Sequence, residues 1–199
     1  MKQKRTMNLR EIVVMAFISA VFGVLYLIWI FLGQMVTGVL GPVGGGLMAG
    51  FWIMAPIVCA LIIQKPGAAL FAELIAAGTE VMVGSVNAGS VLILGVTQGL
   101  GAEIIFAMFR YRSFKMPVLM LAGMAGTFAS FVTQFAMYGY SQYASIVVWL
   151  MLGTMLLSGI LLAGWASHYL TFALARTGVL HNFAIGKSEY QRNKQEPAS

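Results

Sequence analysis

The sequence predicts an all-α membrane protein, a bundle of six transmembrane helices with the N- and C-termini in the cytoplasm. Composition, six apolar segments and the placement of the cations support this prediction. Of 199 residues, 60% are hydrophobic and 9% are charged, whereas soluble globular domains usually carry about 25% charged residues. So few charges cannot form a surface that faces water, so the chain is predicted to lie within a lipid bilayer.

Six apolar segments come close to, or reach, the roughly 20 residues that a helix needs to cross a bilayer. They are residues 12–32, 43–63, 68–84, 91–109, 116–138 and 146–174. The division between the last two rests on the stretch YGYSQYAS, because polar and aromatic side chains favour the membrane interface. The predicted organisation is a basic segment at 1–11, a six-span domain at 12–175 and a basic tail at 176–199.

The lysines and arginines select the number of spans and their orientation. With six spans and a cytoplasmic N-terminus, every cation falls on the cytoplasmic side, as the positive-inside rule requires. The cations are Lys2, Lys4, Arg5, Arg10, Lys65, Arg110, Arg112, Lys115, Arg176, Lys187, Arg192 and Lys194. Five or seven spans would place the basic tail outside. Topology thus accounts for the net charge of +6 without a nucleic-acid partner.

Two connections between the spans carry distinctive glycine and proline patterns. Residues 64–67, QKPG, predict a tight inner turn, because proline is favoured at the start of the next helix. Residues 33–46, GQMVTGVLGPVGGG, predict a flexible outer loop or lid. The GKS triplet at 186–188 is not a nucleotide-binding loop, because His181 stands where that motif needs glycine.

Three acidic residues lie within the apolar spans. Glu73 and Glu80 stand seven residues apart, so both face the same side of the third span, and Glu103 lies near the middle of the fourth. A charge at mid-bilayer costs about 2.5 to 3.5 kcal/mol on insertion scales, and such residues usually face the interior and carry function. No lysine or arginine lies within a span. A ligand could supply the missing partner, either a transported proton or metal ion or an organic cation, while a structural protonated acid is the alternative.

Aromatic and amide side chains at similar depth favour an organic cation, because aromatic faces attract cations and amides orient a ligand. The predicted substrate-binding residues are Glu80, Glu103, Glu73, Trp52, Gln98, Asn87 and Tyr138. No catalytic residue, metal ligand or cofactor is predicted. The two histidines are too few and too badly spaced for a zinc site.

Small residues repeat on one face of the first span, at Ala16, Ala20 and Gly23. This spacing lets another helix approach closely. The pattern alone does not separate a partner subunit from a neighbouring span of the same chain.

The basic N-terminus, the Ala16 and Ala20 pair on the first of six spans, and the length near 200 residues resemble the S components of energy-coupling factor (ECF) vitamin transporters, of the YkoE type. This resemblance implies a multi-pass protein of the bacterial cytoplasmic membrane that binds thiamine or its hydroxymethylpyrimidine precursor from outside. It implies that the first outer loop covers the ligand, and that the alanine pair docks onto a transmembrane coupling subunit driven by ATPases. Three buried acids favour thiamine, which carries a permanent cation.

The sequence gives less support to two other classes of function. A stand-alone secondary transporter would use the acids to relay protons or a metal ion, but neither internal repeats nor paired broken helices are visible. An intramembrane enzyme is disfavoured because no HExxH, paired aspartate or GxSxG motif is present.

Overall fold

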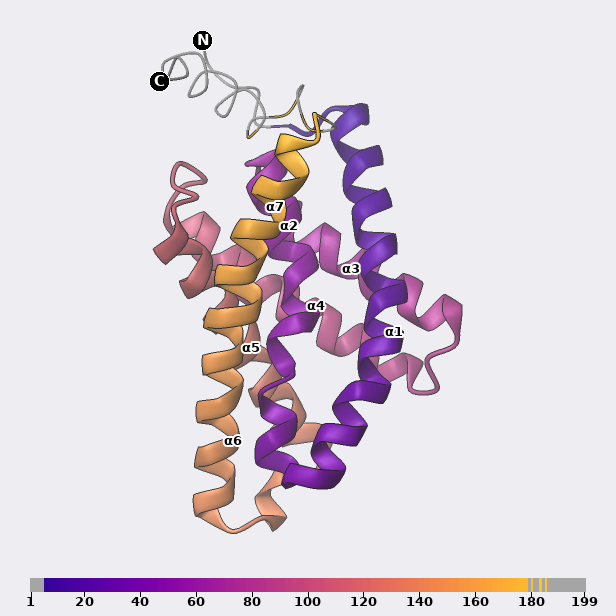
Figure 1. Cartoon of the computed structure of the whole chain (residues 1–199), viewed down its shortest axis with the longest axis vertical. Helices are drawn as coiled ribbons and strands as arrows, with labels where there is room; N and C mark the ends of the chain where they lie inside the picture. Colours follow the sequence, from indigo (N-terminus) through magenta and orange to yellow (C-terminus); the bar gives the residue numbers. More distant parts are fainter. Residues whose placement is uncertain (1–5, 179, 181–182, 184, 186–199) are drawn as a thin grey trace.

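The computed structural model describes residues 6–178, 180, 183 and 185, and this part of the chain contains helices and turns but no strand. Helix α2 lies inside the bundle and contacts α1, α3 and α7 (Figure 1). The bounds of the helices are α1 Leu9–Gly46, α2 Met54–Ile63, α3 Ala68–Val83, α4 Ala88–Met108, α5 Met116–Met137, α6 Ser145–Ser158 and α7 Ser167–Arg176. Two short 3-10 helices, η1 Ala49–Ile53 and η2 Tyr140–Gln142, join them, and the π-helix η3 Gly159–Ala166 makes α6 and α7 one continuous rod.

The last four predicted apolar segments are confirmed as helices, with ends within three residues of those expected. Their boundaries fall where the local sequence changes. Helix α3 follows Gly67, which has a φ of 85°, and ends before Gly84, which has a φ of 125°. Glycine adopts such left-handed conformations without the steric cost that other residues incur.

The expectation of a flexible outer loop at 33–46 was wrong, because α1 continues through this region to Gly46. Residues 33–40 contain nothing that stops a helix except glycines, which a helix tolerates at a modest cost. The chain bends at Gly41, with φ 69° and ψ −171°, immediately before Pro42. A backbone in this region of φ and ψ is essentially restricted to glycine.

The second predicted span is interrupted, which the apolar pattern did not reveal. The 3-10 helix η1 precedes α2, so Trp52 lies at a change of helix type rather than inside a regular helix. All ten residues of α2 are buried. Such complete burial is typical of a helix that is apolar on every side and enclosed by its neighbours.

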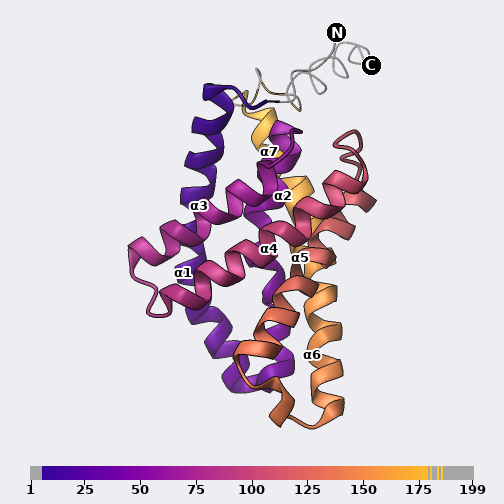
Figure 2. The same cartoon turned by 180° about the vertical axis from the view of Figure 1, so that it is seen from behind.

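Close packing holds the broken region against α6. The Ser158 hydroxyl donates to the Leu47 carbonyl oxygen at 2.6 Å and accepts from the Gly50 amide at 2.9 Å. Nearby, Gly123 of α5 faces Gly159 of η3 with no space for a side chain. Helices α3 and α4 run obliquely across the bundle (Figure 2). The hydrogen bonds of Ser158 therefore fix the turn between α1 and η1, although this residue lies much later in the sequence.

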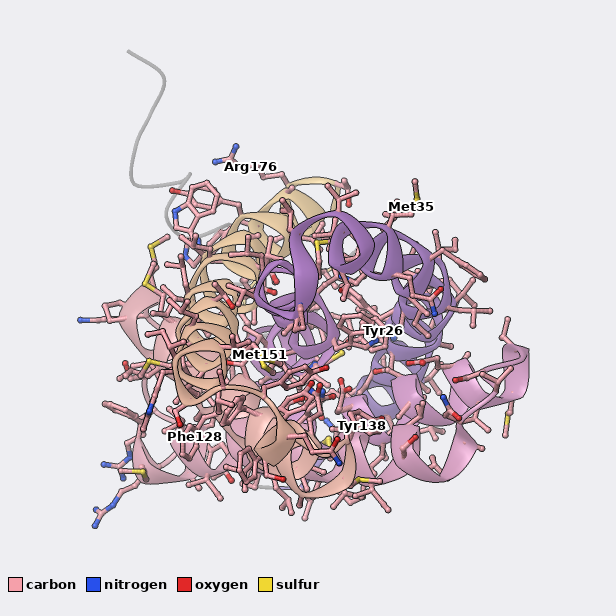
Figure 3. All side chains as sticks on the ribbon, turned by 90° about the horizontal axis from the view of Figure 1, so that it is seen from below. Tyr26, Met35, Phe128, Tyr138, Met151 and Arg176 are labelled. Atoms are coloured by element: carbon pink, nitrogen blue, oxygen red, sulfur yellow. The ribbon has the colours of Figure 1, made fainter. Side chains whose placement is uncertain are left out.

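In the part of the chain that the structure describes, four helical segments are long and apolar enough to cross a membrane: Leu9–Gly46, Ala88–Met108, Met116–Met137 and Ser145–Arg176. Large apolar side chains cover their outer faces. Met35 and Phe128, which are 69% and 50% exposed, point away from the bundle (Figure 3). A soluble protein rarely exposes apolar surface so extensively, so the chain is an integral membrane protein.

Candidate functional site

A large cavity lies at the end of the bundle opposite the start of α1. Its volume is about 820 Å³, within the range of small-molecule pockets. The far end of α1, the α3–α4 connection and the α5–α6 connection form its mouth, and α3, α4 and α5 form its floor. Tyr138 and Met151, which line the cavity, lie near the middle of the molecule when it is viewed from this end (Figure 3).

Six of the seven residues predicted to bind substrate line this cavity: Glu73, Glu80, Trp52, Gln98, Asn87 and Tyr138. Glu73 and Glu80 are 1% and 2% exposed, and Gln98 is 6% exposed. Asn87 and Tyr138 are exposed at the mouth. Among the described residues that line the cavity there is no lysine, arginine or histidine. The two acidic groups of the cavity therefore face no cationic side chain among the described residues.

Glu73 is tied to the broken span through Tyr26 of α1. The hydroxyl oxygen of Tyr26 lies 3.3 Å from Glu73 Oε2 and 2.8 Å from the Trp52 carbonyl oxygen. It also accepts a hydrogen bond from the Ala55 amide at 3.2 Å. Tyr26 is fully buried and points into the bundle (Figure 3). One hydroxyl thus joins α1, the η1–α2 junction and α3.

Amide and hydroxyl groups form the opposite wall. The side-chain amide nitrogens of Gln98 and Gln134 both donate to the Ser130 hydroxyl, at 2.9 and 2.8 Å. Tyr140 in turn donates to Gln134 Oε1 at 2.8 Å. Burial, reinforced by Tyr138 and Tyr143, raises the pKa of Tyr140 to about 12, so its hydroxyl keeps its proton at neutral pH. This wall is held in place by its own hydrogen bonds.

Glu103 does not line the cavity, contrary to its predicted role and mid-span depth. Its carboxylate accepts hydrogen bonds from the backbone amides of Gly67, Ala69 and Leu70, at 2.6, 3.0 and 3.2 Å. The Tyr111 hydroxyl donates a fourth, at 2.7 Å. An acid at a helix N-terminus satisfies free amides and complements the helix dipole. Glu103 therefore caps α3 at the end away from the cavity.

We expect Glu103→Ala to lower the free energy of unfolding by about 1 to 3 kcal/mol, because buried donors would lose their acceptor. A lower midpoint of thermal unfolding would show this. The folded fraction of the Glu103→Ala variant should keep its affinity for ligand. A Glu103→Gln variant with normal thermal stability and no ligand binding would contradict the capping role.

Other residues of the cavity wall were not among the predicted site residues. Gln34 and Thr37 come from the part of α1 that was expected to be a loop. Ser85, Tyr140 and Tyr143 come from the two connections at the mouth. Amides and hydroxyls at the ends of the spans that were predicted to face outside were the signal that could have identified them.

Ala16 and Ala20 lie on α1, at the edge of its exposed face. Both are partly exposed, whereas Gly23 is buried against Ala76 and Thr79 of α3. Val13 and Phe17 beside them are strongly exposed. The small-residue face therefore packs inside the chain at Gly23 and opens to the surroundings towards the start of α1.

Comparisons with known proteins agree with this architecture. Residues 10–129 match a family model described as "ABC-type cobalt transport system, permease component". The chain is 39% identical, over 96% of both chains, to a Bacillus subtilis (strain 168) protein named "Putative HMP/thiamine permease protein YkoE". A crystal structure of an S-component of an ECF transporter matches with a TM-score of 0.92 and 39% identity, covering 96% of both chains. These relatives are transport proteins and not enzymes, and the chain belongs to the YkoE-type family of ECF transporter S components.

Proposed function

We propose that this chain is the substrate-binding subunit of an ECF-type importer and that it captures thiamine, or its hydroxymethylpyrimidine precursor, in the cavity at its outer end. The chain then delivers the vitamin with a coupling subunit and ATPases. One observation above all supports an organic cation as the ligand. Two buried carboxyl groups and an aromatic side chain, Glu73, Glu80 and Trp52, line one cavity in which no described residue supplies a positive charge.

The chemistry of thiamine fits this cavity. Its permanent thiazolium cation can balance a carboxylate and lie against an aromatic face. Its aminopyrimidine ring offers a donor and acceptors that match the Gln98 and Gln134 wall. The name of the Bacillus subtilis relative points to the same two compounds. Thiamine is favoured over the uncharged precursor because only thiamine supplies a permanent positive charge.

Thermal unfolding of the purified chain with a panel of vitamins tests this function. A ligand at 100 times its dissociation constant adds about 2.7 kcal/mol to the stability of the protein that binds it. We expect thiamine to raise the unfolding midpoint most, its precursor less, and anionic vitamins such as biotin not at all. Stabilisation by an anionic vitamin, or by none of the panel, would contradict the proposal.

We also propose that six helical segments cross the membrane, with both termini in the cytoplasm. They are α1, η1 with α2, α3, α4, α5 and the rod formed by α6, η3 and α7. The described cations support this orientation, because they lie at the start of α1, the α2–α3 turn, the α4–α5 connection and the end of α7. The α2–α3 turn is fixed there by a 2.8 Å ion pair between Lys65 and Glu11. The cations of residues 1–5 and 186–199 lie outside the described residues.

Single cysteines test this topology against a Cys59→Ser background. At residues 86–89 and 140–143, in the connections at the cavity mouth, they should react with a membrane-impermeant reagent added to intact cells. At residues 111–114, and at 188–195 in the tail, they should react only after the cells are opened. Labelling near residue 190 in intact cells would rule out the six-span arrangement.

A further inference from the structure

The hydroxyl group of Tyr26 has three polar neighbours, and these restrict where protons can lie. Its oxygen is 2.8 Å from the Trp52 carbonyl oxygen, 3.2 Å from the Ala55 amide nitrogen and 3.3 Å from Glu73 Oε2. A tyrosine hydroxyl has one proton to donate and can accept hydrogen bonds through its oxygen. The Trp52 carbonyl can only accept, and the Ala55 amide can only donate.

These roles leave one arrangement in which every partner is satisfied. The Tyr26 proton goes to the Trp52 carbonyl, at the shortest of the three distances, and the Ala55 amide donates to the Tyr26 oxygen. The remaining contact, to Glu73, then needs a proton from the glutamate. An ionised carboxylate has none to give, so two oxygen lone pairs would face each other in a fully buried place. The network is complete only when Glu73 carries a proton.

Among the described residues, the group that could stabilise the charged form of Glu73 is the Tyr26 hydroxyl, and the nearer Trp52 carbonyl competes for its proton. The titratable groups that act on it or contact it are Tyr26 of α1, Cys59 of α2 and Glu80 of its own helix. From α4 and α5 the neutral side chains Gln98 and Ser130 line the same cavity. No cation among the described residues lines it either. Glu103 is the opposite case, since four donors converge on its carboxylate.

We propose that Tyr26 holds Glu73 as a neutral acid, which leaves Glu80 as the one described carboxyl group of the cavity wall that can carry a negative charge. Tyr26 is a positioning residue, since it does not line the cavity itself but ties the Glu73 proton to the Trp52 carbonyl at the η1–α2 junction. Loss of that proton would draw the Tyr26 hydroxyl towards Glu73 and leave the Trp52 carbonyl without its donor. The wall that carries Trp52 is thereby linked to the protonation of Glu73.

This assignment determines which ligand charge the cavity selects. One anionic and one neutral carboxyl group match a monovalent organic cation, whereas two anionic groups would favour a divalent one. This consequence rests on the proposed function. The proton on Glu73 does not, because it belongs to the ligand-free protein.

Infrared spectroscopy of the ligand-free chain in lipid vesicles at neutral pH tests the assignment directly. We expect a protonated carboxyl C=O band that is lost in Glu73→Gln and retained in Glu80→Gln. Tyr26→Phe should shift the frequency of this band, because the Glu73 proton loses its acceptor. The matched control Tyr169→Phe, at an exposed tyrosine of α7, should leave it unchanged. A spectrum in which Glu73→Gln removes no band would overturn the proposal, whether or not the chain binds thiamine.

Ligand affinity gives a second, separate test. We expect Tyr26→Phe to weaken thiamine binding by about 5- to 150-fold, the range for a coupling of this kind, while the chain still folds because phenylalanine fills the same space. Glu80→Gln should weaken thiamine binding at least about tenfold more than Glu73→Gln, because only Glu80 is lost as a charge. Equal losses in the two glutamine variants would contradict the division of roles.

Discussion

Replacing Glu80 with glutamine is expected to lower the affinity for thiamine by about 2 to 4 kcal/mol, or roughly 30- to 1,000-fold. Glu80 is 2% exposed and lines a cavity in which no described residue is cationic. Removing one partner of a buried charge pair leaves the other charge without compensation. Glutamine keeps the size and hydrogen-bonding capacity of the side chain, so the chain should still fold. Titration calorimetry on the purified variant measures the change.

Two controls separate loss of the counter-ion from general damage. Glu11→Gln removes one negative charge near the start of α1, where Glu11 pairs with Lys65, and should leave the affinity for thiamine unchanged. The uncharged precursor should bind Glu80→Gln with a much smaller loss than thiamine does. If Glu80→Gln bound thiamine as tightly as the parent chain, Glu80 would not be the counter-ion.

Leucine at both Ala16 and Ala20 is expected to abolish uptake while leaving ligand affinity at the parental level. Both alanines lie near the start of α1, far from the cavity mouth, and both are partly exposed. If a coupling subunit packs against this face, added bulk should cost about 1 to 3 kcal/mol at each site. Uptake, co-purification with the coupling subunit and ligand affinity should be measured on one set of preparations.

The matched control is Ala136→Leu, at an exposed alanine of α5 that does not line the cavity. It should affect neither uptake nor affinity. Normal uptake by the double variant would rule out docking through this face. Poor expression with weakened binding would instead show that the face packs inside the chain, as Gly23 does. Uptake by the chain alone, without ATP or partners, would favour the stand-alone transporter.

The apolar pattern was sufficient to predict helix type and position where one helix follows another through a short, charged or glycine-rich turn. Helices α3, α4 and α5 and the rod from Ser145 to Arg176 end close to the expected residues. At these places Gly67, Gly84 and the basic 110–115 connection mark the ends. Local sequence and tertiary structure agree there.

The pattern failed where tertiary contacts decide the backbone. Residues 33–40 are helical although their glycines suggested a loop, and η1 interrupts a span that is apolar throughout. The η1 turn depends on Ser158, about a hundred residues later in the chain, which satisfies its backbone groups. No local window of sequence contains that information. The expectation of unbroken spans was therefore wrong for the second span.

The residues of the candidate site were likewise predicted only in part. Depth along the helices was enough to bring Glu73, Glu80, Gln98 and Trp52 to one cavity. It misplaced Glu103 because the oblique course of α3 and α4 puts this acid beside the start of α3, where free amides attract a carboxylate. Apolar periodicity does not report how two helices are tilted against each other.

The position of bound thiamine tests the central claim most directly. A crystal structure of the purified chain with thiamine should place the vitamin in the cavity that Glu80 and Trp52 line, with its thiazolium ring close to the Glu80 carboxylate. One of its rings should lie within about 6 Å of the Trp52 ring centroid, the range of a cation–π contact. Thiamine bound outside this cavity, or with its cationic ring remote from Glu80, would contradict the account.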